Sequence, residues 1–118
     1  MMIKKPSKYK NIKITRLLPN GELVSFDSKK EALRFDKLLL LAKQGIIKNL
    51  TLQPEFEIIP TLKWGKTTLR KIKYIADFKY EQDNKIIIED SKGFKTKEYQ
   101  LKKRLFILQN PDLEFREV

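Results

Sequence analysis

The segment KIIIEDSK, residues 85–92, is an apolar run that ends in two acids and a lysine. Because side chains alternate along a strand, Asp90 and Lys92 are expected on one face and Glu89 and Ser91 on the other. A carboxylate can bind a cation, and a neighbouring ammonium suits a phosphate or an attacking water. The segment therefore indicates a reactive site at the end of a buried strand.

The strand expected just before this segment carries a further acid, Asp77. The two strands, separated by EQDN, predict an antiparallel hairpin. A two-residue turn at Asp83-Asn84 places Asp77 directly opposite Asp90, whereas a four-residue loop places it opposite Ile88. Either even-length loop keeps both acids and the lysine on one face. A three-residue loop does not, unless a bulge restores the register.

Opposed carboxylates on a sheet repel each other by a few tenths to ~1 kcal/mol. A divalent cation between Asp77 and Asp90 removes that cost, because hard cations prefer carboxylate oxygens. Two carboxylates and Lys92 around one point are the apparatus of metal-assisted phosphodiester hydrolysis.

A third acid, Glu31, begins the stripe that a helix would form with Phe35, Leu38 and Ala42. One interpretation is a capping box, in which Glu31 bonds the backbone N–H of Ser28. The other is that Glu31 points over the sheet edge and helps to hold the metal or its water. The helix pattern alone leaves both open.

The elements that must position these residues follow from periodicity and turn residues. We expect a hairpin over 12–26 turning at Asn20-Gly21, a helix over 27–45, an extended segment over 50–60 broken at Pro54, a loop or hairpin tip over 61–71, strands over 71–80 and 85–92, a helix over 96–110 and a short final strand over 112–118. This order predicts an α/β (α+β) fold, with a mixed sheet of about four to five strands flanked by two helices. A single domain is expected over 1–118, with a basic, flexible arm at 1–11.

Composition narrows the partners and the chemistry. The chain has 26 Lys and Arg against 15 Asp and Glu, a formal charge of +11, which favours nucleic acid over a membrane surface as the partner. With no Cys and no His, disulfides, Cys/His zinc sites and histidine bases are excluded, so a metal must be held by oxygen. The longest apolar run is too short to cross a bilayer and no signal peptide is visible, so an intracellular location is expected.

The pattern of Glu31, Asp77 and Asp90-Ser91-Lys92 resembles the PD-(D/E)XK nuclease superfamily, which includes type II restriction enzymes and archaeal Holliday-junction resolvases. The chain is similar to a group of short, uncharacterised phage-encoded proteins of that superfamily, through stretches like FDSKKEA, LTLQPEFEI, YIADFKY and IEDSKGFKTKEYQLKKRLF. The resemblance covers nearly the whole chain. It implies a restriction-endonuclease-like core and hydrolysis of DNA.

The resemblance also implies roles for the residues of the hairpin. Asp77 and Asp90 match the two acids of the motif, with Ala76 where the motif has its proline, and Lys92 matches its lysine. Asp77, Asp90 and the backbone carbonyl of Ser91 would bind Mg²⁺ or Mn²⁺ in such a site. Lys92 would orient or deprotonate the attacking water and stabilise charge on the phosphorane.

Two residues outside the hairpin complete the implied site. Glu31 matches an acid found on the first helix in several branches, where it would assist in catalysis and hold the metal directly or through water. Gln53 matches a polar residue near the site.

Basic residues gather in three clusters, between residue 1 and Arg16, over 61–73 and over 92–104. One such cluster is typical of a solvated face, but three together favour phosphate binding. Trp64 and Tyr99 are candidates for stacking on bases, with ordinary packing as the alternative. The residues expected to contact nucleic acid are Gln53, Lys66, Arg70, Lys71, Lys95, Thr96, Lys97, Lys102 and Lys103.

Together these observations predict a Mg²⁺-dependent endonuclease for DNA. No base-reading motif is visible, so recognition of backbone or shape is expected. The resemblance implies branched, Holliday-junction or nicked DNA in phage DNA processing as the substrate. A homodimer would let two sites cut two strands. The alternative is a non-catalytic nucleic-acid-binding module on the same scaffold. A basic structural protein would leave the arrangement of the acids and the lysine unexplained.

Overall fold

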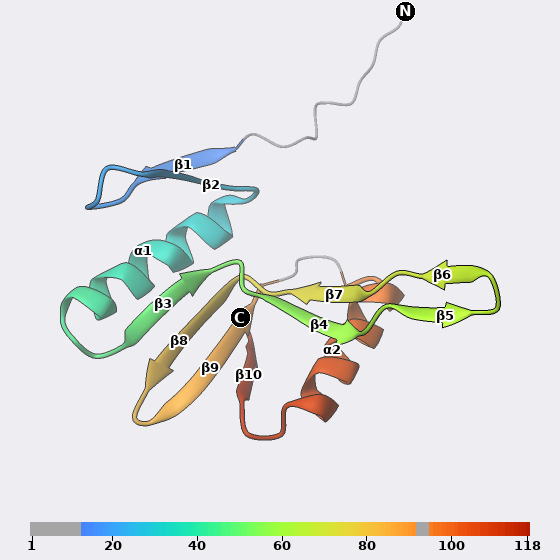
Figure 1. The fold of residues 1–118 in the computed structure, drawn as a ribbon. Coiled ribbons are helices and arrows are strands. Elements are labelled where there is room, and N and C mark those ends of the chain that lie inside the picture. Colours follow the sequence, from blue (N-terminus) through green and yellow to red (C-terminus); the bar gives the residue numbers. More distant parts are fainter. Residues whose placement is uncertain (1–12, 92–94) are drawn as a thin grey trace, which may run out of the picture.

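The computed structural model describes residues 13–91 and 95–118, so the expectations for the arm at 1–11 and for Lys92 lie outside the described residues. The elements are β1 (Ile14–Leu17), β2 (Leu23–Phe26), α1 (Lys29–Lys43), β3 (Lys48–Leu52), β4 (Glu55–Ile59), β5 (Leu62–Trp64), β6 (Thr67–Leu69), β7 (Ile72–Ile75), β8 (Phe78–Gln82), β9 (Lys85–Asp90), α2 (Lys97–Gln109) and β10 (Glu114–Glu117) (Figure 1).

A mixed sheet of four strands, in the order β10-β9-β8-β3, forms the centre of the fold. Strands β3, β8 and β9 are antiparallel neighbours, whereas β10 runs parallel to β9 after the crossover through α2. Helices α1 and α2 pack on different hydrophobic clusters (Figure 1). The predicted α+β fold with a mixed four-stranded sheet and two helices is confirmed. No helix among the described residues is long and apolar enough to cross a membrane.

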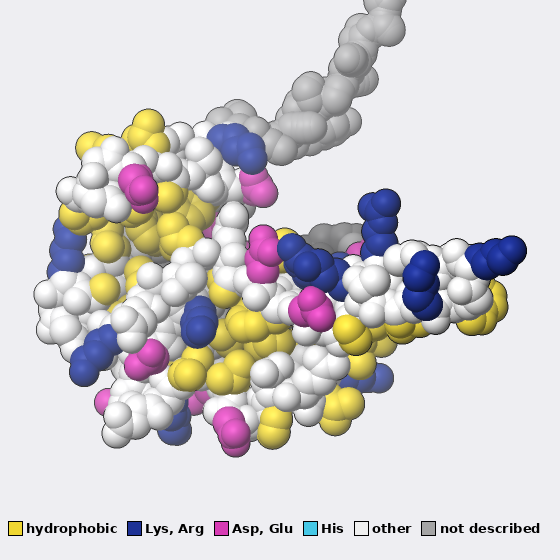
Figure 2. Space-filling model, in the orientation of Figure 1, with side chains coloured by type: hydrophobic (Ala, Val, Ile, Leu, Met, Phe, Trp, Pro, Cys, Tyr) yellow, Lys and Arg dark blue, Asp and Glu magenta, His cyan; other side chains and the backbone are white. Residues whose placement is uncertain are grey.

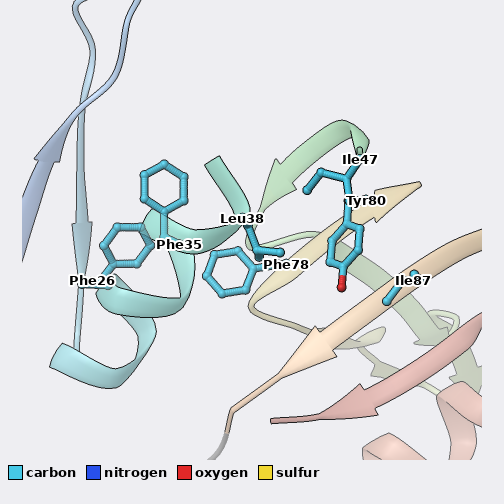
Figure 3. Close-up of a cluster of buried hydrophobic side chains, with 8 residues drawn as sticks. Phe26, Phe35, Leu38, Ile47, Phe78, Tyr80 and Ile87 are labelled. Carbon is cyan, nitrogen blue, oxygen red and sulfur yellow. The ribbon is translucent and has the colours of Figure 1, made fainter. Parts of the chain in front are cut away.

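The hydrophobic core beneath α1 is built largely from aromatic rings (Figure 3). Phe35 and Leu38 are buried on the predicted helix stripe, and the ring centroids of Phe26 and Phe35 lie 5.1 Å apart. Phe78 is fully buried against them. Each such side chain contributes roughly 1.5–3 kcal/mol relative to an exposed one.

A separate cluster fills the space between α2 and the other sheet face. Phe106 of α2 is buried there with Tyr74 of β7 and Ile88 of β9, and its ring centroid lies 4.5 Å from that of Phe56. Ile87, the neighbour of Ile88, belongs instead to the core beneath α1. Strand β9 is therefore covered on both faces, which explains its unbroken run of isoleucines.

The β8–β9 hairpin has the two-residue turn that the sequence suggested. Asp83 and Asn84 both adopt positive φ angles, 52° and 65°, as a type I′ turn requires. Gln82 pairs with Lys85 and the register continues to Phe78 opposite Glu89. The four-residue loop is therefore wrong, and the predicted register is confirmed over these pairs.

Both helices are capped at their N-termini by a side-chain hydroxyl. The Ser28 hydroxyl accepts from the Glu31 backbone N–H at 3.1 Å, and the Thr96 hydroxyl accepts from the Tyr99 N–H at 3.0 Å. Each cap satisfies one N–H of the helix's first turn and is worth about 1 kcal/mol.

The β5–β6 arm, residues 62–69, extends beyond the two-stranded β4–β7 ribbon (Figure 1). Within the described chain, the residues of β5 and β6 are all exposed. Lys and Arg side chains appear along this extension, with hydrophobic side chains on its lower edge (Figure 2). The expected loop or hairpin tip over 61–71 is thus a regular hairpin.

Candidate functional site

The candidate site lies at a corner where two paired strands leave the central sheet. The Gln53 N–H donates to the Asp77 carbonyl at 2.9 Å, and the Ala76 N–H donates to the Pro54 carbonyl at 3.1 Å. These bonds continue the pairing from β3–β8 into β4–β7. Gln53 has a φ of 49°, a left-handed conformation that costs a non-glycine residue roughly 1–2 kcal/mol. Strain of this kind is frequent at functional sites.

Asp77 departs from the hairpin's regular register at this corner. Its N–H donates to the Glu89 carbonyl at 3.0 Å, although Glu89 is also the partner of Phe78. Asp77 and Phe78 therefore both lie opposite Glu89, and two residues opposite one is the pattern of a β-bulge. The Asp77 carboxylate accepts from the Ser91 N–H at 2.7 Å and from the Ser91 hydroxyl at 2.6 Å. Asp77 is thus held by the residue after Asp90 instead of standing squarely opposite Asp90.

Asp90 is fully buried on the face that carries the second core. The hydroxyl of Tyr74, on β7, donates a hydrogen bond to its carboxylate. Burial raises the pKa of Tyr74 above its ordinary value, and the hydrogen bond to Asp90 and the negative charges of Asp90 and Asp77 raise it further. Both carboxylates therefore act electrostatically on the Tyr74 hydroxyl.

A cleft of about 580 Å³ opens at this corner and gathers residues from distant parts of the chain. The predicted site residues that line it are Glu31, Gln53, Asp77, Ser91, Thr96 and Lys102. Tyr74 also lines it and connects it to the buried Asp90. These residues come from α1, the β3–β4 corner, the β7–β8 corner, the end of β9 and the start of α2. The fold thus brings most of the expected acidic site to one place.

Glu31 has features of both interpretations that the sequence left open. Its backbone N–H donates to the Ser28 hydroxyl, which is one of the two bonds of a capping box, and the residue is 8% exposed. Its position in the lining of the cleft is also what a site residue requires. The bond to Ser28 uses the main chain of Glu31.

The cleft has the kind of ligand atoms that a hard divalent cation prefers, but few of them lie close together. Glu31 and Asp77 line one cavity, and Asp90 lies behind Tyr74. These are hard oxygen donors of the type that Mg²⁺ and Mn²⁺ take. Within residues 13–91 and 95–118, however, no three acidic side chains are grouped closely enough to hold a metal together. A metal held there by the described residues would therefore have at most two acidic side chains as direct ligands.

Glu89 has a structural partner that sequence reasoning missed. Its fully buried carboxylate accepts from Arg34 Nε at 2.8 Å and Arg34 Nη2 at 2.5 Å, and from the Tyr80 hydroxyl. The predicted alternation already placed Glu89 on the face opposite Asp90. A buried carboxylate needs a cation or hydrogen-bond donors. Arg34, which lies on the same helix as Glu31, could therefore have been predicted as the partner of Glu89.

Some of the basic residues predicted to contact nucleic acid form ion pairs within the protein, and others do not. Lys71, Lys95, Lys102 and Lys103 have carboxylate partners at 4.0, 3.6, 3.1 and 2.9 Å, with Lys95 and Lys103 sharing Glu117. In the described part of the chain, Lys66, Arg70 and Lys97 have none. The Tyr99 hydroxyl and the Lys103 ammonium lower the pKa of Glu117 by hydrogen bonding to it. Lys103 thus links α2 to β10 through Glu117.

The architecture defines an α+β protein with a mixed four-stranded sheet and an acidic cleft at its edge. A family model described as "Protein of unknown function (DUF1064)" matches residues 6–118, and the chain belongs to that family. No curated protein and no solved structure matches the chain.

Proposed function

We propose that this chain is a metal-dependent DNA endonuclease with a restriction-endonuclease-like core of the PD-(D/E)XK kind. The observation that supports it most is the single cleft that collects Glu31, Asp77 and Ser91 from separate elements, with Asp90 buried behind its wall. A purely structural sheet edge has no need to bring Glu31 and Asp77 from separate elements into one cavity. A basic protein with such an acidic pocket suits cation-assisted attack on a polyanion.

In this proposal Asp77 and Asp90 would hold Mg²⁺ or Mn²⁺, with the Ser91 carbonyl as a further ligand and Glu31 acting through a bound water. Ser91 fixes one oxygen of Asp77 and Tyr74 fixes Asp90, so both carboxylates are oriented before the ion arrives. The bound ion would neutralise the scissile phosphate and lower the pKa of the attacking water. Lys92, outside the described residues, would orient or deprotonate that water. Thr96 and Lys102, in the same cleft, would contact the phosphate.

The proposed substrate is branched, Holliday-junction or nicked DNA in phage DNA processing, recognised through backbone and shape. A homodimer would place two such sites on two strands. The alternative is a non-catalytic nucleic-acid-binding module. One observation favours it: the described residues form no three-acid metal cluster.

The test compares wild type with Asp77→Asn on linear, nicked, flapped and four-way DNA, with Mg²⁺ and then Mn²⁺. Asp83→Asn is the matched control, because it removes an acid at the opposite end of the same hairpin, where Asn tolerates the left-handed backbone. We expect the control to cut like wild type. We expect Asp77→Asn to bind equally well in EDTA and to cut at least about 100-fold more slowly, the scale of losing one charge-stabilising group.

Equal cutting by Asp77→Asn and wild type would refute the assigned site. Binding without cleavage by wild type, across both ions and every DNA shape, would instead establish the binding module. Asp90→Asn serves as a further variant, and its folding must be verified first because Asp90 is fully buried.

A further inference from the structure

The β5–β6 arm exposes an aromatic residue that the proposed site does not use. Trp64 is 72% exposed, and Leu62 and Leu69 are 44% and 41% exposed. A large aromatic side chain left in water at the end of a projecting hairpin contributes little to folding, because it buries little apolar area. Its placement calls for an external partner.

The turn sorts the arm into two faces. Gly65 has a φ of 61° at the first central position, and Trp64 pairs with Thr67, so the turn is of the type II′ kind that favours glycine there. Strand alternation then puts Trp64 on the face that holds the paired Leu62 and Leu69. Lys63 belongs to the opposite face.

The charge on the arm identifies the chemistry of the partner. The sequence has no Asp or Glu between Glu57 and Asp77. Within the described residues, Lys63, Lys66 and Arg70 have no carboxylate partner, whereas Lys71 and Lys73 are paired with acids of β4. A second copy of the arm would bring the same cations together, and like charges facing each other oppose association. A polyanion would neutralise them.

We propose that the β5–β6 arm binds nucleic acid with unpaired or unstacked bases, with Trp64 stacking on a base and Lys63, Lys66 and Arg70 on phosphates. Nucleic acid supplies both an anionic backbone and flat apolar surfaces, which matches the two features of the arm. A continuous duplex hides its base faces, so junctions, flaps and single strands are the preferred ligands. The inference deepens the proposed function and rests on it for the choice of nucleic acid as substrate.

The β4–β7 ribbon connects the arm to the acidic cleft. Strand β7 leads from the arm to Ala76 and Asp77, and β4 leads back to Gln53. Lys73, between the arm and the corner, lines the cleft. A nucleic-acid strand bound along the β4–β7 ribbon would therefore pass from Trp64 toward the proposed site of hydrolysis.

The test uses the full chain in EDTA, where no metal-dependent cleavage occurs. Trp64 is the only tryptophan in the sequence, so its emission reports on the arm directly. We expect a single-stranded oligonucleotide and a four-way junction to quench it strongly, and a blunt duplex to quench it less. Heparin, a polyanion without bases, should bind in a salt-dependent way without comparable quenching. Unquenched emission with DNA fully bound would overturn the proposal.

Variants then separate stacking from charge. Trp64→Ala should weaken binding of the single strand by roughly 5- to 150-fold, the range for one stacked base. Leu108→Ala removes an apolar side chain of similar exposure, 74%, from α2, and should bind like wild type. Replacing Lys63, Lys66 and Arg70 by Gln should reduce the slope of log affinity against log salt by roughly 0.7 per charge, while Lys48→Gln should not.

The outcomes distinguish this inference from the proposed function. Wild-type binding by Trp64→Ala would overturn the inference even if the protein cuts DNA. Strong quenching by a protein that never cuts would sustain the inference and count against the endonuclease. A DNA-free dimer, seen by sedimentation and lost in Trp64→Ala, would show that the arm joins copies of the chain, which also overturns the inference.

Discussion

Ser91 holds one carboxylate oxygen of Asp77 with two hydrogen bonds, from its backbone N–H at 2.7 Å and from its hydroxyl at 2.6 Å. Asp77 directly precedes β8 and Ser91 directly follows β9. The bonds therefore tie together the two chain ends of a hairpin whose turn is at the other end. They set the direction of Asp77 once the hairpin has formed.

Ser91→Ala should loosen Asp77 without removing its charge. The N–H bond remains and the hydroxyl bond is lost, so we expect the free energy of unfolding to fall by about 1–2 kcal/mol, near the value of a hydrogen bond to a charged group. Metal-dependent cleavage should also slow. Urea unfolding and cleavage assays measure the two effects. Ser25→Ala, at an exposed position of β2, is the control, and a loss no larger than its own would contradict the prediction.

Replacing Arg34 should lower the free energy of unfolding far more than replacing a surface arginine that also pairs with a carboxylate. Arg34→Met leaves the fully buried Glu89 without its cation, so we expect a loss of about 3–5 kcal/mol. Arg16→Met breaks a pair with Asp36 in which both side chains are substantially exposed, and should cost far less. Chemical denaturation of both variants provides the comparison. Similar losses would show that burial of Glu89 does not govern the effect.

Stability should decline at alkaline pH because of Tyr80. The pKa of Tyr80 is raised from an ordinary value of 10 to about 12, first by burial and then by the hydrogen bond to Glu89 and the charge of Glu89. The folded state favours the protonated phenol, so this contribution is complete below pH 10 and is lost as the pH rises toward 12.

Unfolding midpoints measured across this range should therefore decrease with pH. In Tyr80→Phe the decrease should be shallower by the equivalent of about one proton. Tyr74 and Tyr99, whose pKa values are also raised by burial, keep part of the slope in that variant. A slope that Tyr80→Phe leaves unchanged would assign the whole effect to those residues.

Gln53→Gly should separate backbone strain from side-chain function. Glycine adopts the positive φ of this corner freely, so stability should stay within about 1 kcal/mol of wild type or increase. Cleavage should fall, because the amide that lines the cleft is lost. Asn84→Gly, at the left-handed turn remote from the cleft, should leave cleavage unchanged. Thermal unfolding and cleavage rates report the two effects, and full activity in Gln53→Gly would remove Gln53 from the site.

Local patterns predicted the elements well because their causes are local. Asp83-Asn84 set the hairpin turn, Ser28 and Thr96 capped the helices, and alternation assigned Glu89 and Asp90 to opposite faces. Each of these features depends on residues that are close along the chain.

The details of the site depend instead on contacts between distant segments. The bulge at Asp77 arises where Gln53 and Pro54 bend the neighbouring strand, and the burial of Asp90 depends on Tyr74 meeting it across the second core. The pairing of Glu89 with Arg34 requires α1 to dock on β9. Periodicity does not specify contacts between distant segments, so the sequence suggested candidate site residues but not the hydrogen bonds that they make.

The antiparallel ribbon that joins the arm to the corner has a consequence for how the protein can vary. Residues inserted or deleted in matched pairs, one on each strand near Gly65, would lengthen or shorten the arm while the alternation of side chains is kept. The register at Asp77 would stay the same. The reach of Trp64 and the chemistry of the cleft can therefore change independently, although both are carried by the same two strands.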